Sequence, residues 1–343
     1  MIQDLWFFLT CATFAAYVVL DGYDLGAGIV SPFVAKTDHE KHEVLKTILP
    51  FWDGNEVYLI TGGATLYLAF PRLFPAFVSG FYLPVMIVLW LLALRGVAIE
   101  MRHKLDQPLW NELWDGGFFF ASTLLVLFFG AAIGNVVRGV SVDENGDFFA
   151  PLWTDLGVGD DVGILDWYTL LVGAAAIAVI ARHGALRLAV RAEDESVAER
   201  ARAVAAKLLA PAAVLPAVAT FATFRIQPNV IAGLAARPWT AVFGLLAAGG
   251  TALSARLAGE NAYRASSATL IGLFGCACVG VYPYGLVARI ASRSVLAADA
   301  AAEPYGLTIG LAWWLPGMAL VVAYSTYAHR RFFARKRVAS AAE

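Results

Sequence analysis

The sequence predicts an all-α integral membrane protein that crosses the bilayer nine times. Of its 343 residues, 59% are hydrophobic and only 15% are charged, whereas soluble domains carry about 25% charged residues. One helical crossing needs about 20 consecutive apolar residues. Runs of roughly this length lie at residues 5–28, 53–70, 73–96, 116–138, 164–182, 205–225, 238–257, 266–288 and 307–329. We therefore expect a single membrane domain over residues 1–343, built as two four-helix bundles plus one extra helix.

The longest connection between apolar runs, residues 138–163, divides the chain into two halves. It carries six carboxylates, at Asp143, Glu144, Asp147, Asp155, Asp160 and Asp161, so residues 141–163 are expected to form a solvated acidic loop. Residues 1–140 would then form a first helix bundle, and residues 164–343 a second half that serves mainly as scaffold. The charged, Ala-rich stretch 192–207 predicts a short surface helix or a helical extension.

The basic residues predict the orientation of the chain. With nine spans, 19 of the 25 Lys and Arg residues fall on one side of the membrane. Since Lys and Arg are enriched in cytoplasmic loops, the N-terminus is expected outside, the C-terminus in the cytoplasm and the acidic loop outside. The net charge of −2, with basic residues scattered through short loops, gives no reason to expect a nucleic-acid partner.

Five carboxylates lie inside or at the edge of apolar runs: Asp21, Asp24, Asp53, Glu56 and Glu100. A charge in hydrocarbon is costly, so such residues usually face the interior of a bundle and mark an ion path, a proton relay or a paired structural site. In the predicted topology all five lie toward the cytoplasm, with Asp21 deeper and Asp24 nearer to water. This arrangement predicts a proton entrance.

The spacing of the first four carboxylates leaves structural alternatives open. Asp21 and Asp24 are three residues apart and share a helix face, but Asp24 is equally explained as part of a polar helix end. Asp53 and Glu56 have the same spacing, and Asp53 could instead be an N-terminal helix cap.

The only cation inside its apolar run is Arg95. It is expected to form a structural ion pair with one of these carboxylates. The alternative is an arginine whose head group reaches the interface while its stem stays in the membrane.

The five histidines, His39, His42, His103, His183 and His329, fall in predicted cytoplasmic loops or helix ends. A haem within the bilayer needs axial His, Met or Cys at membrane depth, so this chain alone is expected to bind no haem. The histidines are interpreted as surface groups, and no metal site is predicted because they do not cluster with carboxylates. The sequence also lacks nucleotide-binding and nucleophile-elbow motifs, so no catalytic residues are assigned to it.

Several segments, in this order, resemble subunit II of cytochrome bd-type quinol oxidases. The first two are LDGYDLG at residues 20–26 and PFWDGNEV at residues 50–57. Further matches are SGFY at 79–82, RGVAIE at 95–100, Trp110, Trp114-Asp115 and Gly134-Asn135. The resemblance is dense over about residues 5–140, whereas residues 160–343 match mainly in hydropathy and number of helices.

The resemblance implies a bacterial cytoplasmic-membrane protein that pairs with a homologous subunit I. In this family subunit I carries the haems b and d and the quinol-oxidising loop, and subunit II contributes to a cytoplasmic proton pathway. The acid that matches Asp53 takes part in that pathway, and Glu100 falls where some members place an Asp. Spans 1 to 4 are expected to contact subunit I. Some members also hold a structural quinone or small accessory subunits.

Two other hypotheses remain at this stage. A proton-coupled transporter could use the same carboxylates, although it predicts broken helices in both halves, and the chain could be a purely structural membrane scaffold.

Overall fold

Helices account for almost all of the chain in the computed structural model, which describes the backbone of residues 1–339 and the side chains up to residue 331. The helices are α1 (Ile2–Val34), α2 (Asp38–Ile48), α3 (Trp52–Ala69), α4 (Leu73–Gly80), α5 (Tyr82–Met101), α6 (Pro108–Arg138), α7 (Trp167–Arg191), α8 (Glu195–Lys207), α9 (Leu209–Ile226), α10 (Pro228–Ala235), α11 (Ala241–Arg256), α12 (Gly259–Val281), α13 (Ala297–Ala300) and α14 (Pro304–Ala339). One short hairpin, β1 (Tyr284–Leu286) with β2 (Val295–Leu296), follows α12.

Seven helical segments of the described chain are long and apolar enough to cross a membrane, and an eighth arises if α10 and α11 form one span bent by 101°. The all-α membrane architecture is thereby confirmed. The count of nine stays a prediction, because its weakest member, α3, has only 18 residues and opens with polar groups. The predicted surface helix at 192–207 is confirmed as α8, and residues 139–166 form the irregular connection between α6 and α7.

The predicted bounds of the span 73–96 are wrong, because the chain breaks into α4 and α5 at Phe81, and α5 alone is long and apolar enough to cross the membrane. Pro84 lies in the first turn of α5, where its missing N–H costs no helical hydrogen bond. The connection between α6 and α7 fills the break: Phe148 packs against Phe81 with 4.9 Å between ring centroids. The Ala150 amide also donates to the carbonyl of Gly80 over 3.0 Å.

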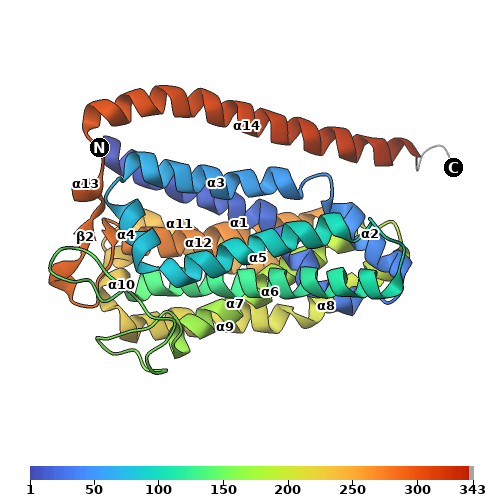
Figure 1. The fold of residues 1–343 in the computed structure, drawn as a ribbon, viewed down its shortest axis with the longest axis horizontal. Helices are drawn as coiled ribbons and strands as arrows, with labels where there is room; N and C mark the ends of the chain where they lie inside the picture. The colour runs from blue at the N-terminus through green and yellow to red at the C-terminus, as the bar shows by residue number, and fades with distance from the viewer. Residues whose placement is uncertain (340–343) are drawn as a thin grey trace.

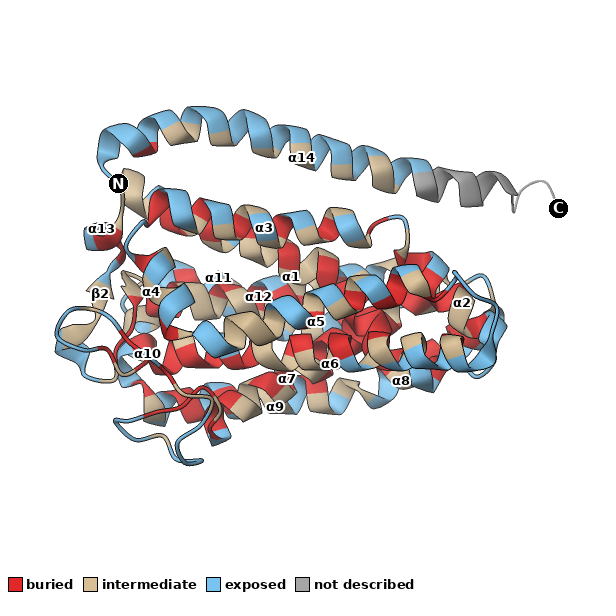
Figure 2. Cartoon of the chain, viewed as in Figure 1, coloured by how far each residue is buried: buried red, intermediate tan, exposed pale blue. Residues whose placement is uncertain are grey.

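The larger of two hydrophobic clusters is built chiefly from α1, α6 and α7, and buried residues line these helices in Figure 2. The smaller cluster, which includes Trp6, Phe148 and Leu286, lies at the end of the bundle near the hairpin. Glycines permit the close approach of α1 and α7. A Cβ atom added at Gly26 would lie 2.3 Å from the Ile180 carbonyl oxygen, and one added at Gly184 would lie 2.3 Å from the Gly26 carbonyl carbon. Small residues at such crossings allow helix backbones to meet in a membrane.

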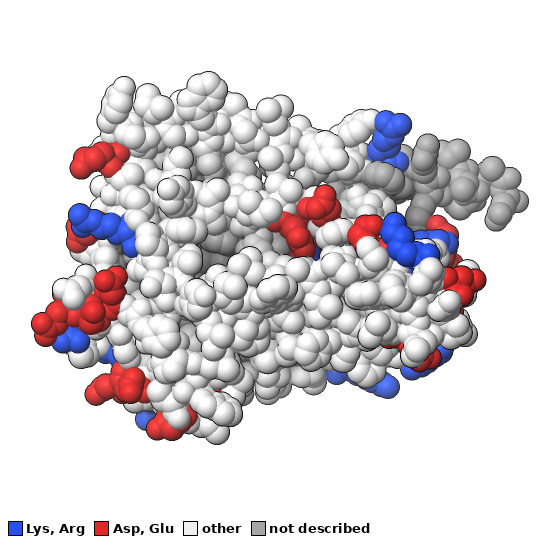
Figure 3. Space-filling model, viewed as in Figure 1, with Lys and Arg blue, Asp and Glu red and all other residues white. Residues whose placement is uncertain are grey.

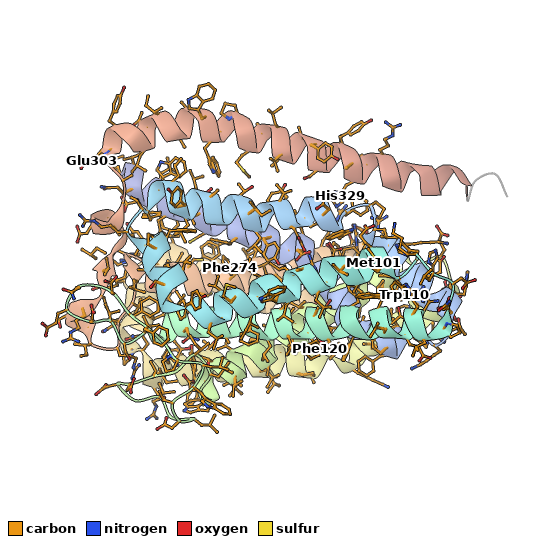
Figure 4. All side chains as sticks on the ribbon, in the orientation of Figure 1. Met101, Trp110, Phe120, Phe274, Glu303 and His329 are labelled. Carbon is orange, nitrogen blue, oxygen red and sulfur yellow. The ribbon has the colours of Figure 1, made fainter. Side chains whose placement is uncertain are left out.

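The last helix, α14, runs along the bundle beside α3 and begins at the same end of the molecule as α1 (Figure 1). At that end the Trp6 indole donates to the Leu307 carbonyl over 3.1 Å. Toward the other end the His329 ring stacks on Phe51 at 4.4 Å, and Figure 4 shows Glu303 and His329 toward opposite ends of α14. Arg335, Lys336 and Arg337, which contribute to the predicted charge bias, have side chains outside the described residues.

A buried charged cluster as the candidate functional site

An arginine joins three helices in the middle of the bundle. Arg95 of α5 is fully buried, and its Nη1 donates to both carboxylate oxygens of Asp21 on α1 over 2.9 Å. Its Nη2 donates to Glu56 of α3, whose side chain is about one fifth exposed. A buried arginine with two carboxylate partners is the arrangement that makes a charge tolerable at membrane depth. We name Arg95, Asp21 and Glu56 the charged cluster.

Asp24 lies beside this cluster without contacting Arg95. Its Oδ2 accepts a hydrogen bond of 2.8 Å from the Asn55 amide, and its Oδ1 has no partner among the described residues. Asp24 is 0% exposed, so the expectation that it lies nearer to water than Asp21 is wrong. The reason is that α1 continues to Val34, more than two turns beyond Asp24.

Asp53 and Glu100 lie on the outside of this chain, and neither side chain forms a hydrogen bond or ion pair within the described residues. Asp53 is the second residue of α3, and the helix begins without a side-chain cap, so Asp53 is not the N-cap. Figure 3 shows acidic atoms over α3 and α5 surrounded by uncharged surface. The structure therefore unites three of the five predicted acids around Asn55 and Arg95 and leaves these two exposed.

The interpretation of every histidine as a surface group is wrong for His183. Its side chain is 0% exposed, and its ring stacks on Tyr263 of α12 with 4.6 Å between centroids. Its two ring nitrogens lie 3.0 Å from the Ser266 hydroxyl and 3.2 Å from the Val19 carbonyl. The prediction ended the span at Arg182, but α7 continues to Arg191.

A second polar group at the predicted cytoplasmic end was not foreseen from the sequence. Arg102 donates to Asp115 and to Asp38, each over 2.7 Å, and so links the end of α5 to α6 and α2. The Glu40 carboxylate of α2 is held from two sides. It accepts a hydrogen bond from the backbone amide of Lys36 in the preceding loop, and it forms an ion pair with Arg200 of α8. These hydrogen bonds lower the pKa of Glu40 from 4.5 to about 2.

A third group lies at the predicted external end. Arg138 and Asp166 are both 0% exposed and form an ion pair between the end of α6 and the start of α7. Arg138 also donates to Asn135 over 2.6 Å, and Asp166 caps α7 through the Tyr168 and Thr169 amides. This group fastens both ends of the acidic loop to the bundle. Only Asn135 was singled out in the sequence.

Carboxylates that share an arginine, together with an amide-bound carboxylate, are groups that can bind and release protons. Among residues 1–331, whose side chains the structure describes, no group of three or more His, Cys, Asp or Glu residues could hold a metal ion. Fold and site together thus define a polytopic helical membrane protein with a buried acid–arginine cluster.

Comparison with known proteins identifies the family. Residues 2–332 match the family model described as cytochrome bd terminal oxidase subunit II, and the chain belongs to this family. The resemblance noted in the sequence is thereby confirmed.

Relatives and a solved structure agree with this assignment. The chain is 33% identical over 208 residues to cytochrome bd ubiquinol oxidase subunit 2 of Bacillus subtilis, covering 61% of this chain and 59% of that one. It is 33% identical over 197 residues to cytochrome bd-I ubiquinol oxidase subunit 2 of Escherichia coli K12, covering 57% and 50%. The matches therefore span between half and three fifths of these relatives. The bd oxidase structure from Geobacillus thermodenitrificans shares the fold, with a TM-score of 0.73, 16% identity and coverage of 96% and 98%.

Proposed function

We propose that this chain is the non-haem subunit of a bacterial bd-type quinol oxidase, and that it supports a haem-bearing subunit I while passing cytoplasmic protons toward it. The observation that carries the proposal is the charged cluster, which lies inside the family's signature segments. Asp21 and Glu56 come from the two densest motifs, and Arg95 opens a third. Family membership favours this function over a secondary transporter or a pure scaffold.

The exposed faces of α3 and α5 support a protein partner on this side. On α3, Val57, Ile60 and Tyr67 are exposed along the same helix face as Asp53. On α5, Trp90 and Val97 are exposed along the face that ends at Glu100. An apolar stripe that ends in a carboxylate suits a protein partner better than lipid. We therefore assign this face to subunit I, in keeping with the predicted contact through the first four spans.

In the proposed pathway Asp53 and Glu100 collect protons near the cytoplasmic surface. Glu56 lies one helical turn deeper than Asp53 and contacts Arg95. The arginine holds the negative charge of Asp21 and Glu56 within the membrane, so that a proton arriving there meets a preorganised acceptor. The N-terminus would face outside and the C-terminus the cytoplasm.

The haems are assigned to the partner, where they would supply electron transfer and the reduction of oxygen. His183, the one fully buried histidine among the described residues, has a hydrogen-bonding partner for each ring nitrogen. It therefore has no free nitrogen for a haem iron.

Co-purification with cross-linking tests the proposal. A photo-reactive residue at Ile60 or Trp90, which are 70% and 72% exposed, should cross-link to a haem-bearing subunit. The matched positions Phe221 and Leu245 on α9 and α11 are 65% and 73% exposed and should not. A haem spectrum from this chain purified without any partner, or cross-links chiefly from α9 and α11, would contradict the proposal.

A further inference from the structure

A row of polar contacts from the second half of the chain reaches the helix turn that carries the buried acids. On α7, His183 and Arg187 are four residues apart, and on α12, Glu260, Tyr263 and Ser266 follow at intervals of three. Residues with these spacings share one helix face. We name these five residues the polar seam. It was not expected, because the second half was interpreted as scaffold.

The contacts of the polar seam are continuous from the surface inward. Glu260, whose side chain is 37% exposed, accepts two hydrogen bonds of 3.1 Å from Arg187. The Arg187 guanidinium lies 4.4 Å from the centre of the Tyr263 ring. The other neighbour of that ring is His183, which completes the path from the exposed end of α12 to a fully buried imidazole.

The hydrogen bonds of His183 decide which ring nitrogen carries the proton of the neutral imidazole. The Val19 carbonyl can only accept, so Nε2, 3.2 Å away, must carry the proton. Ser266 can then donate its hydroxyl proton to Nδ1 over 3.0 Å. The neutral imidazole is therefore held in one tautomer, and it joins α12 to the backbone of α1.

The same turn of α1 is held from another helix. Asn55 of α3 donates to the Leu20 carbonyl over 3.3 Å while it also binds Asp24. Val19 and Leu20 directly precede Asp21. A helical carbonyl has a second lone pair, so it can accept such a bond without losing its place in the helix. Donors from α7 and α3 thus act on two consecutive carbonyls next to the acid that binds Arg95.

We propose that His183 is a positioning residue for the buried acids of α1. By donating to the Val19 carbonyl, it fixes the rotation of α1 and keeps Asp21 aligned with Arg95. The inference rests on the proposed proton function of these acids. A small misplacement of a reacting group slows its step strongly, so loss of this hydrogen bond should slow proton delivery without removing a proton carrier.

The test compares His183→Leu, which cannot donate, with His183→Gln, whose amide can reach the same carbonyl. In the purified complex, normalised to haem content, His183→Leu should lower kcat for quinol-driven oxygen uptake by about three- to tenfold. The KM for quinol should stay unchanged, and the solvent deuterium isotope effect on kcat should rise because proton delivery becomes slower. His183→Gln should recover most of the rate. Wild-type kinetics in His183→Leu, or no recovery in His183→Gln, would overturn the proposal.

Two controls separate positioning from general destabilisation. Ser266→Ala removes the partner of Nδ1 and should reproduce part of the loss, whereas Thr269→Ala, one turn further along α12, should not. Thr269 is equally buried but bonds to Ala265 and Thr251 instead of His183. Equal kinetic effects of Ser266→Ala and Thr269→Ala would overturn the proposal.

A spectroscopic measurement tests the geometry independently of proton transfer. In ¹⁵N-histidine solid-state NMR of the complex, the signals lost in His183→Gln should show a protonated Nε2 and an unprotonated Nδ1 at neutral pH. An imidazolium or the opposite tautomer would overturn the proposal. If this tautomer is found but Asp53→Asn is fully active, the proposed proton pathway is refuted while the geometry assigned to His183 is upheld.

Discussion

Arg95 donates from a single guanidinium nitrogen to both carboxylate oxygens of Asp21, and neither side chain is accessible to solvent. The two residues are 74 positions apart in sequence, so this contact sets how α5 lies against α1. Arg95 also binds Glu56, so one cation offsets the negative charge of two carboxylates. Removing Arg95 leaves two carboxylates without a cation, whereas removing one of the acids leaves Arg95 paired with the other.

The first prediction concerns this arginine. Arg95→Gln leaves Asp21 buried without a cation, and breaking a buried pair in this way costs about 3–5 kcal/mol. We expect a strongly reduced yield of assembled complex and a lower midpoint of thermal unfolding. The double variant Arg95→Gln with Asp21→Asn removes both charges and should recover part of the stability. If the double variant is no more stable than Arg95→Gln, the pair is not the cause.

The crossing of α1 and α7 gives a second prediction. In Gly26→Ala the new methyl group meets the Ile180 carbonyl at 2.3 Å, so the helices must separate, at a cost of about 1–3 kcal/mol. The matched control is Gly63→Ala on α3, where nothing lies within 4 Å of an added Cβ. The thermal unfolding midpoint should fall for Gly26→Ala only. Similar midpoints for the two variants would show that the backbones are not in close contact.

The external group around Arg138 gives a third prediction. Arg138→Gln leaves Asp166 buried and unpaired and frees both ends of the acidic loop. Limited proteolysis from the external side should then cut residues 139–166 faster than in the wild type. Arg293→Gln, which loses an ion pair to the exposed Glu144 and a hydrogen bond of 3.2 Å to the Val142 carbonyl, serves as control because Arg293 is itself partly exposed and surface pairs contribute little. Equal cleavage rates would refute the fastening role.

Glu40 predicts a pH dependence of stability. Its pKa is lowered in the folded chain to about 2, so the unfolded chain binds more protons in the acid range. The stabilisation by Glu40 is fully present above its ordinary pKa of 4.5 and is lost as the pH falls through about 2. Wild type should therefore unfold at a higher temperature than Glu40→Gln at about pH 6, and the difference should shrink toward about pH 3. A difference that does not change with pH would contradict this assignment.

How far the sequence predicts the site depends on the residue. Arg95 is the only cation in its apolar run, so a carboxylate partner could be expected, but the choice of Asp21 and Glu56 follows from how α1, α3 and α5 pack. The end of α7 was predicted too early, because the charge of Arg182 was interpreted as the point where the helix leaves the membrane. Instead, Arg182 is buried against Ser254 and Arg187 against Glu260, so the helix stays in protein.

For the fold, too, the sequence predicts some features, and others depend on how distant segments pack. Long apolar runs reveal most crossings, since hydrocarbon demands about 20 apolar residues whatever the neighbours are. The break at Phe81 carries no charge and depends on Phe148 from a distant loop, although Pro84 was a signal that could have revealed it. The bend between α10 and α11 likewise could not be predicted from hydropathy, which is similar on both sides of it.

The most direct test of the proposed function is quinol-driven oxygen uptake by the complex carrying Asp53→Asn, normalised to haem content. Asparagine keeps the shape of the side chain but cannot bind and release a proton. If Asp53 relays cytoplasmic protons, assembly and haem content should stay near wild type while turnover falls by about tenfold or more. Asp161→Asn in the external loop, an equally exposed aspartate on the other side, should leave turnover unchanged. Full activity in Asp53→Asn would contradict the account and leave Asp53 as a structural residue.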